Sequence, residues 1–161
     1  MDDTDRALIA ALRRDARSTW TELGRTVGLS GPSVTERVSR MEKAGVITGY
    51  HATVDPAALG RSVAALVGIH LSDTSNQDAV EVELSRLEEI EDCWFVAGEE
   101  SFTIKVRVPD VIALETALSR LRRIQGIAYT RTTVVLSTKW EGRVAGLMEA
   151  CVGDEATEAS T

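Results

Sequence analysis

The chain has 161 residues, of which 43% are hydrophobic and 27% charged, and its formal net charge at pH 7 is -7. These values are ordinary for a globular protein of one or two domains, and no apolar run approaches the roughly 18 residues of a membrane span. The N-terminus shows no secretory signal pattern, and the two cysteines have no metal-ligand spacing. We therefore expect a cytoplasmic protein with no membrane span, no metal and no cofactor.

Charge is unevenly distributed along the chain. Residues 1–62 have a net charge of +1, whereas residues 63–161 have a net charge of -8. A nearly neutral N-terminal part on an acidic body fits a protein whose N-terminal part alone contacts a polyanion. An ordinary two-domain protein can show the same contrast by chance.

The N-terminal part predicts three short helices. Asp2 or Asp3 can cap a first helix over about residues 4–15. Its apolar stripe comprises Leu8, Ile9 and Leu12. Thr19 followed by Glu22 matches a capping box, so a second helix begins directly after Thr19.

The third helix lies between turn-forming residues. Gly28 suits a left-handed end to the second helix, and Ser30 can cap the next one. Pro32 falls in the first turn, where no backbone N–H is missed, and Gly45 ends the helix after about Ala44. Two helices joined by a short turn containing glycine are typical of a helix-turn-helix unit, whose second helix enters the DNA major groove.

The residues of this third helix divide by face. Its apolar residues are spaced i, i+4, i+7 and comprise Val34, Val38 and Met41. Its candidate DNA-binding residues comprise Ser33, Glu36, Arg37, Arg40 and Lys43. The alternative is a solvated face of a small helical bundle, as most runs of charged residues are. After Gly45, the stretch VITGYHATVD alternates β-forming residues around Gly49, which predicts a short wing or hairpin.

The remaining chain predicts strands and helices in a different order. The expected strands lie at 61–71, 93–97, 102–108 and 127–138, and the first of them is buried. A helix is expected at 77–88, between the first two strands. A second helix lies between the last two strands; Asp110 caps it, Gly126 ends it, and its apolar residues are Val111, Leu114, Leu118 and Leu121. This β-α-β-β-α-β order is the ferredoxin-like arrangement, whose helices cover one sheet face. The first strand is apolar on both sides, so we expect the open face to pair with a second subunit.

The predicted fold is therefore α+β, with an N-terminal winged helix-turn-helix domain followed by a ferredoxin-like βαββαβ domain. The predicted boundaries are a helix-turn-helix domain at 1–50, a linker with a short strand at 51–62, the ferredoxin-like domain at 63–140 and a C-terminal extension at 141–161. The extension ends in VGDEATEAST, small and acidic residues that predict disorder.

Four stretches together resemble the Lrp/AsnC, or feast/famine, family of transcription regulators. They are DRALIAALRRDAR, TELGRTVGLSGPSVTERVSRMEKAGVITGY, VAGEESFTIKVRVPD and TRTTVVL, and the resemblance covers about residues 3–140. It implies a sequence-specific regulator that binds double-stranded DNA as a homodimer, with assembly into octamers as a further possibility. A homodimer also predicts a pseudo-palindromic operator. The C-terminal domain would sense a small-molecule effector, usually an amino acid.

The resemblance also implies an effector site. The family carries a glycine and acidic residues in the turn between the second and third strands, and threonines on the last strand. The corresponding residues of this sequence are Gly98, Glu99, Glu100, Ser101, Thr130 and Thr132. Ser101 stands where the family often has a second acid, which leaves the identity of the ligand open. A solvated hairpin turn is the alternative interpretation.

Other chemistry-bearing residues give weaker signals. We interpret His70 as an interface or core residue, Trp94 as a packing residue or a pocket lining, and Cys93 as a buried small hydrophobe. The sequence contains no Ser-His-Asp set, paired carboxylates at a defined spacing or phosphate-binding glycine loop, so we expect no enzyme. A rival hypothesis is an amino-acid-binding module whose N-terminal domain contacts protein instead of DNA; the basic face of the third helix argues against it.

Overall fold

The computed structural model describes residues 1–142, and the chain forms two compact units. One unit comprises residues 1–53 together with the segment that begins at Trp140, and the other comprises residues 54–139. Arg13 Nη2 donates to the carbonyl oxygen of Gly142 within the first unit. The predicted disordered tail, which ends in VGDEATEAST, lies outside the described residues.

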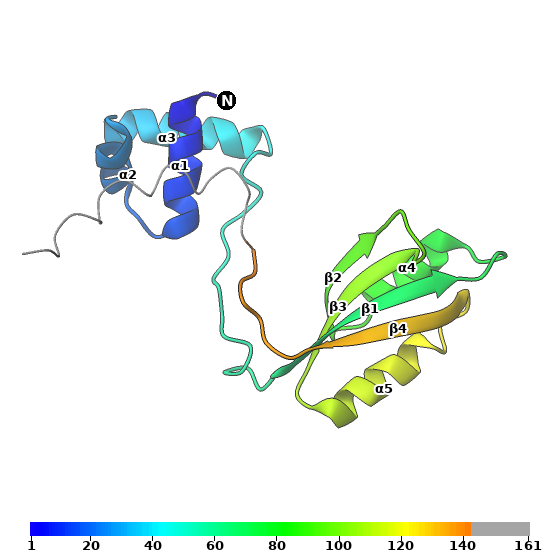
Figure 1. Cartoon of the computed structure of the whole chain (residues 1–161). Helices are drawn as coiled ribbons and strands as arrows, with labels where there is room; N and C mark the ends of the chain where they lie inside the picture. The colour runs from blue at the N-terminus through cyan, green and yellow to red at the C-terminus, as the bar shows by residue number, and fades with distance from the viewer. Residues whose placement is uncertain (143–161) are drawn as a thin grey trace, which may run out of the picture. The chain divides into compact units, whose positions relative to one another are not determined.

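The first unit contains the three predicted helices (Figure 1). They are α1 (Asp3–Arg14), α2 (Trp20–Val27) and α3 (Gly31–Lys43). Asp2 caps α1 in a reciprocal capping box with Asp5, and Thr19 and Glu22 form the predicted box at α2. These side chains bind backbone N–H groups that lack partners within the helix, so the sequence itself determines where each helix begins.

The three helices bury one apolar core. It comprises Leu8, Leu12, Leu23, Val34, Val38 and Met41, each at most 6% exposed. All three predicted apolar residues of α3 are in this set, which confirms the expected helix face. One side of α3 is therefore fixed against α1 and α2, and the other is available to a partner.

The predicted wing is wrong. Residues 48–55 form no strand and no hairpin in the described chain. The β-forming side chains Val46, Tyr50 and Val54 are all exposed, and Ile47 is the residue of this stretch that packs on the helical core. A two-stranded hairpin is marginal in water unless much of it packs against further strands or a helix, and here the side chains of Val46, Tyr50 and Val54 remain exposed.

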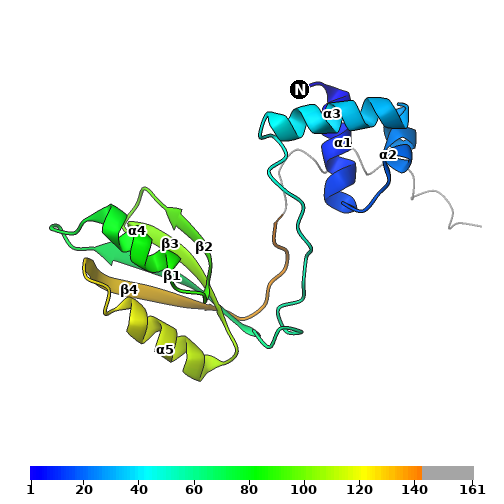
Figure 2. The same cartoon turned by 180° about the vertical axis from the view of Figure 1, so that it is seen from behind.

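The second unit has the predicted β-α-β-β-α-β order. Its elements are β1 (Val63–Leu71), α4 (Gln77–Ser85), β2 (Ile90–Phe95), β3 (Phe102–Val108), α5 (Val111–Leu121) and β4 (Ile127–Val135). The strands form one antiparallel sheet in the order β2-β3-β1-β4, with α4 and α5 both against one face (Figure 2). The ferredoxin-like fold is confirmed.

Several boundaries differ from the prediction. Helix α4 ends at Ser85 because Arg86 begins a turn, and β2 begins at Ile90, three residues before the predicted start. Val111 is exposed and does not join the buried stripe of α5, since it lies in the first turn beside the capping residue Asp110. The spacing of apolar residues alone does not define where a helix or strand ends, because tertiary contacts determine these ends.

The core of this unit lies between the sheet and its helices. Its fully buried members include Val67, Ile69, Val80, Leu84, Phe102, Ile104, Val106 and Leu121. Side chains alternate along a strand, so those of Leu66 and His70 point to the open face, and Gly68 lies between them. Leu66 is 40% exposed there, as expected for a strand that is apolar on both sides.

Candidate functional site

The turn between α2 and α3 brings the two helices into close contact. Gly28 adopts a left-handed conformation with φ of 69°, and the Leu29 N–H donates to the Gly24 carbonyl oxygen over 2.8 Å. A Cβ atom on Gly24 would lie 2.4 Å from the Leu29 carbonyl oxygen, which is too close for any side chain. The glycines therefore set the angle at which α3 leaves α2.

The outer face of α3 presents three of the predicted DNA-binding residues. Glu36, Arg40 and Lys43 are exposed, on the side away from the core. Ser33 is half-buried and takes part in the helix cap, where its hydroxyl lies 2.9 Å from that of Ser30. Pro32 belongs to the same outer face. Only polar residues were selected from the sequence as DNA-binding candidates, so Pro32 was left out. The helical rotation of 100° per residue places it opposite the core.

Arg37 lies on the flank of α3 and contacts α1. Its Nη1 atom donates to Asp2 Oδ2 over 2.7 Å and to Asp5 Oδ1 over 2.8 Å. Its side chain is 28% exposed, against 63% for Arg40, whose Nη2 lies 3.4 Å from the same Asp5 oxygen. Arg37 therefore lies at the side of α3 that faces α1, because a pair of carboxylates at the start of α1 binds it. Its contact with DNA stays a prediction.

The carboxylates of this cluster are held in their charged form. Hydrogen bonds from Arg37, and then from the backbone N–H of Asp2, hold the pKa of Asp5 below its usual value. The same guanidinium, with the Asp5 N–H, lowers the pKa of Asp2. Asp5 is 3% exposed, so its charge depends on these partners.

The predicted effector turn connects β2 with β3. The Val96 N–H donates to the Ser101 carbonyl oxygen over 3.0 Å, and the Ser101 N–H donates to the Ile69 carbonyl oxygen over 2.8 Å. The Glu100 side chain lies over Gly68 of β1, since a Cβ there would approach Glu100 Cγ to 2.6 Å. The turn is thus attached to the central strand, and Gly68 makes room for its acid.

An arginine of β4 pairs with both acids of this turn. Arg131 forms an ion pair with Glu100 and lies 3.7 Å from Glu99. The backbone N–H of Glu100 and the Arg131 guanidinium lower the pKa of Glu100. Glu99 is 80% exposed and Glu100 19% at the side chain, so Glu99 is the more accessible carboxylate. Sequence reasoning missed Arg131, although it stands between the two predicted threonines.

The predicted threonines lie on the other face of the sheet. Thr130 pairs with Ile69 and Thr132 with Val67, whose side chains are fully buried under the helices. Directly opposed residues of antiparallel strands point to the same face. The Thr130 hydroxyl is buried and has no hydrogen-bond partner within the described part of the chain. One copy of the chain therefore does not bring the acidic turn and the threonines to one face.

The weaker candidates have clear positions. His70 is 7% exposed and stacks on Tyr129 with ring centroids 3.9 Å apart. Trp94 is 47% exposed and lies on the same open face, on the edge strand β2. Cys93 is exposed, which corrects the buried assignment, because β2 is an edge strand. Among the described residues, no three His, Cys, Asp or Glu side chains group as metal ligands. No helix in the described chain is long and apolar enough to cross a membrane.

Two family models match the chain. The model of the AsnC-type helix-turn-helix domain matches residues 1–42, and that of the Lrp/AsnC ligand binding domain matches residues 64–145. The first covers α1, α2 and nearly all of α3, and the second covers the sheet with α4 and α5.

Individual proteins show the same similarity. The chain is 41% identical over 143 residues to the HTH-type transcriptional regulator LrpA of Mycobacterium tuberculosis, covering 89% of this chain and 95% of the relative. It is 37% identical over 143 residues to the leucine-responsive regulatory protein of Escherichia coli, covering 84% and 85%. The feast or famine regulatory protein of M. tuberculosis complexed with L-methionine has a TM-score of 0.83 and 41% identity, with 89% and 97% covered.

Proposed function

The chain belongs to the Lrp/AsnC family of transcriptional regulators, and on this premise we propose how its residues carry out regulation. The observation that carries the proposal is the outer face of α3, where Arg40 and Lys43 are exposed while the opposite side is buried in the helical core. This face enters the major groove of an operator. We propose a regulator that acts in the cytoplasm, on the chromosome, and catalyses no reaction.

The DNA contacts divide between base reading and phosphate binding. Arg40 reads a base edge because its side chain is largely exposed, and Lys43 binds a phosphate near the end of the helix. Ser33 and Glu36 lie in the N-terminal half, where base edges are usually met. Arg37 acts through its carboxylate partners and holds α3 against α1.

Two copies of the chain are needed for useful affinity, because one helix covers few base pairs. The open sheet face, with Leu66, Trp94 and Tyr129 exposed, supplies a two-fold interface. The operator is then a pseudo-palindrome with half-sites about one helical turn apart, or a multiple of that spacing. Dimers assemble further into octamers.

An amino acid is the proposed effector. The matched ligand binding domain and the methionine complex of the M. tuberculosis relative support this class of ligand. The ammonium pairs with Glu99, while Gly98, Glu100 and Ser101 shape the turn around it. Thr130 and Thr132 lie on the opposite sheet face, so a site that uses both groups takes them from different subunits.

A footprint on the DNA upstream of the protein's own gene tests the DNA-binding proposal. The unchanged protein should protect a pseudo-palindrome at physiological salt, and Arg40→Ala together with Lys43→Ala should abolish that protection. Arg86→Ala, a change at an exposed arginine directly after α4, is the matched control and should leave it intact. A protein that folds but shifts no such DNA would favour an N-terminal domain that binds protein.

A further inference from the structure

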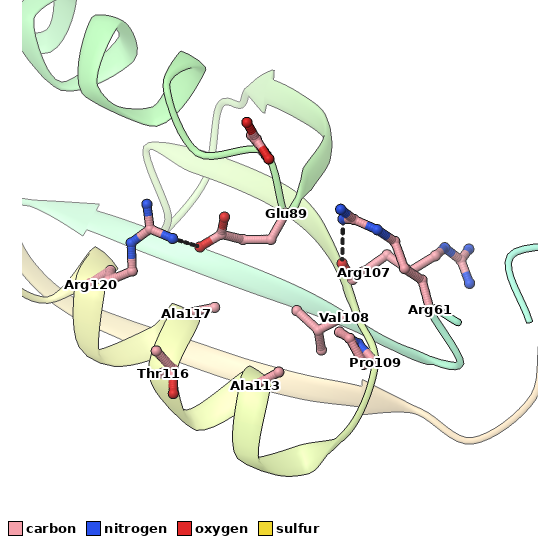
Figure 3. A pocket seen from close by; sticks show the side chains of 10 residues that line it. Arg61, Glu89, Arg107, Val108, Pro109, Ala113, Thr116, Ala117 and Arg120 are labelled. Atoms are coloured by element: carbon pink, nitrogen blue, oxygen red, sulfur yellow. Dashed lines mark hydrogen bonds and ion pairs between the residues drawn. The ribbon is translucent and has the colours of Figure 1, made fainter. Parts of the chain in front are cut away.

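A pocket lies at the end of the sheet opposite the Gly98–Ser101 turn (Figure 3). Its volume is about 340 Å³, and it lies where β3 ends, between α5 and the loop that precedes β2. The seven residues of β3 separate the pocket from the turn, a span of about 20 Å at roughly 3.3 Å per residue. The pocket is therefore distinct from the effector site proposed above.

Three arginines line this pocket, and Arg61 and Arg120 stand on opposite sides of it in Figure 3. The third, Arg107, is bound by Glu91, whose Oε1 accepts from Arg107 Nε over 2.7 Å. Arg61 Nη1 donates to the Arg107 carbonyl oxygen over 3.4 Å, a long contact that leaves most of its guanidinium donors available. Arg120 Nη1 lies 2.9 Å from Glu89 Oε1, and its side chain is 51% exposed. The Glu89 carboxylate is 13% exposed and fixes the position of the Arg120 guanidinium. Arg61 and Arg120 each retain N–H groups for a carboxylate.

The surface between the arginines is small and apolar. It comprises Val108, Pro109, Ala113 and Ala117. Thr116 also lines the pocket, but its hydroxyl already donates to the Ile112 carbonyl oxygen over 3.0 Å. The space between the two cations therefore suits a short hydrocarbon chain more than a polar one.

We propose that this pocket binds a small dicarboxylate, with one carboxylate at Arg61, the other at Arg120 and the methylene chain over the alanines. The volume is at the lower end of the range for ligand pockets, about 300–1,000 Å³, which excludes large ligands. Glu88 also lines the pocket and has no partner among the described residues, so it repels ligands with additional negative charge. This site goes beyond the proposed function because it adds a second ligand class at a separate place.

Calorimetry with the full chain and unbranched dicarboxylates from malonate to adipate tests the proposal. One chain length should bind best, because Arg61 and Arg120 lie on opposite sides of the pocket and one carboxylate spacing spans it best. Butyrate, which has one carboxylate, should bind at least tenfold more weakly than the best diacid. Arg61→Gln and Arg120→Gln should each weaken that diacid at least tenfold, whereas Glu88→Gln should strengthen it.

Controls separate this site from the effector turn. Arg86→Gln, at an exposed arginine directly after α4, and Glu99→Gln, in the turn, should leave dicarboxylate binding unchanged. Thermal unfolding should show that the Arg61 and Arg120 variants remain folded. Binding that survives both arginine changes, or equal binding of butyrate, would overturn the proposal. If Glu99→Gln abolishes amino acid binding but not dicarboxylate binding, the result supports the effector turn and does not contradict the dicarboxylate site.

Discussion

At the scale of single residues, Asp5 is the centre of the contacts between α1 and α3. Its carboxylate accepts from Arg37 over 2.8 Å, from Arg40 over 3.4 Å and from the Asp2 N–H over 3.1 Å, while the residue is 3% exposed. A buried carboxylate that loses its partners leaves an uncompensated charge, which is costly. Arg37 and Arg40 thus have different roles despite similar positions in the sequence.

We expect Arg40→Ala and Arg37→Ala to have different effects. Arg40→Ala should cost roughly 1–3 kcal/mol of operator binding and relax specificity at one base position. The free energy of unfolding of the Arg40→Ala protein should change by no more than about 0.5 kcal/mol, as for other substitutions at exposed sites. Arg37→Ala should lower the free energy of unfolding by roughly 1–3 kcal/mol because Asp5 stays buried. Footprinting measures operator binding, and denaturant unfolding measures the free energy of unfolding. If Arg37→Ala leaves stability unchanged but relaxes specificity at one base position, Arg37 reads DNA.

The same cluster predicts how stability depends on pH. The pKa values of Asp2 and Asp5 are lower in the folded chain than their usual value of 3.8. Their stabilising contribution is therefore complete above that value and is lost as the pH falls through the lowered folded pKa. Melting temperatures between pH 7 and pH 2 should drop less for Asp5→Asn than for the unchanged protein. Equal drops in both proteins would mean that other carboxylates control acid unfolding.

At the scale of elements, the α2–α3 turn depends on Gly24. We expect Gly24→Ala to destabilise the chain by roughly 1–3 kcal/mol, because the added methyl group meets a backbone oxygen that cannot move away. Alanine's better helix propensity, worth about 1 kcal/mol, only partly offsets this. Gly31→Ala is the matched control, since its Cβ would meet Thr21 Oγ1 at an ordinary 3.7 Å. Denaturant unfolding should show loss in the first variant and none in the second.

The open face of the sheet is the element proposed for dimerisation. Leu66 lies in the middle of β1, between Lys105 of β3 and Thr133 of β4, and is 40% exposed. We expect Leu66→Asp to convert dimers to monomers, because a buried unpaired carboxylate opposes association. Sedimentation velocity at micromolar concentration measures this. Val111→Asp, an exposed change on the helix layer, should leave the dimer intact, and a stable monomer of the unchanged protein would contradict the interface itself.

At the scale of the whole molecule, regulation requires that the effector prefer one assembly over another. We expect the best amino acid to change operator affinity by about 5–150-fold, the range typical of allosteric coupling. Arg131 already forms ion pairs with both acids of the turn, Glu99 and Glu100. A ligand with a side-chain ammonium group in addition to its α-ammonium group would therefore find these carboxylates already paired. Neutral amino acids should therefore bind better than lysine.

The variant Arg131→Gln tests this charge argument. It frees Glu99 and Glu100, so lysine should gain affinity relative to leucine or methionine in calorimetry. Arg120→Gln, which removes a cation at the far end of the sheet, should leave the ranking unchanged. No amino acid binding at millimolar concentration would mean that this chain regulates without such an effector.

The sequence by itself determined the three N-terminal helices and the order of strands and helices in the second unit, but not the absence of a wing after Gly45. Caps such as Thr19 with Glu22, the left-handed Gly28 and the apolar spacing of α3 act over a few residues, so they can be seen in the chain alone. The tertiary structure alone decided which side chains meet. Arg37 binds Asp2 and Asp5 because α1 packs across α3, and Arg131 reaches the acidic turn because β4 lies beside β1. Such partners lie more than 30 residues apart, and their meeting depends on packing between elements, which periodicity does not define.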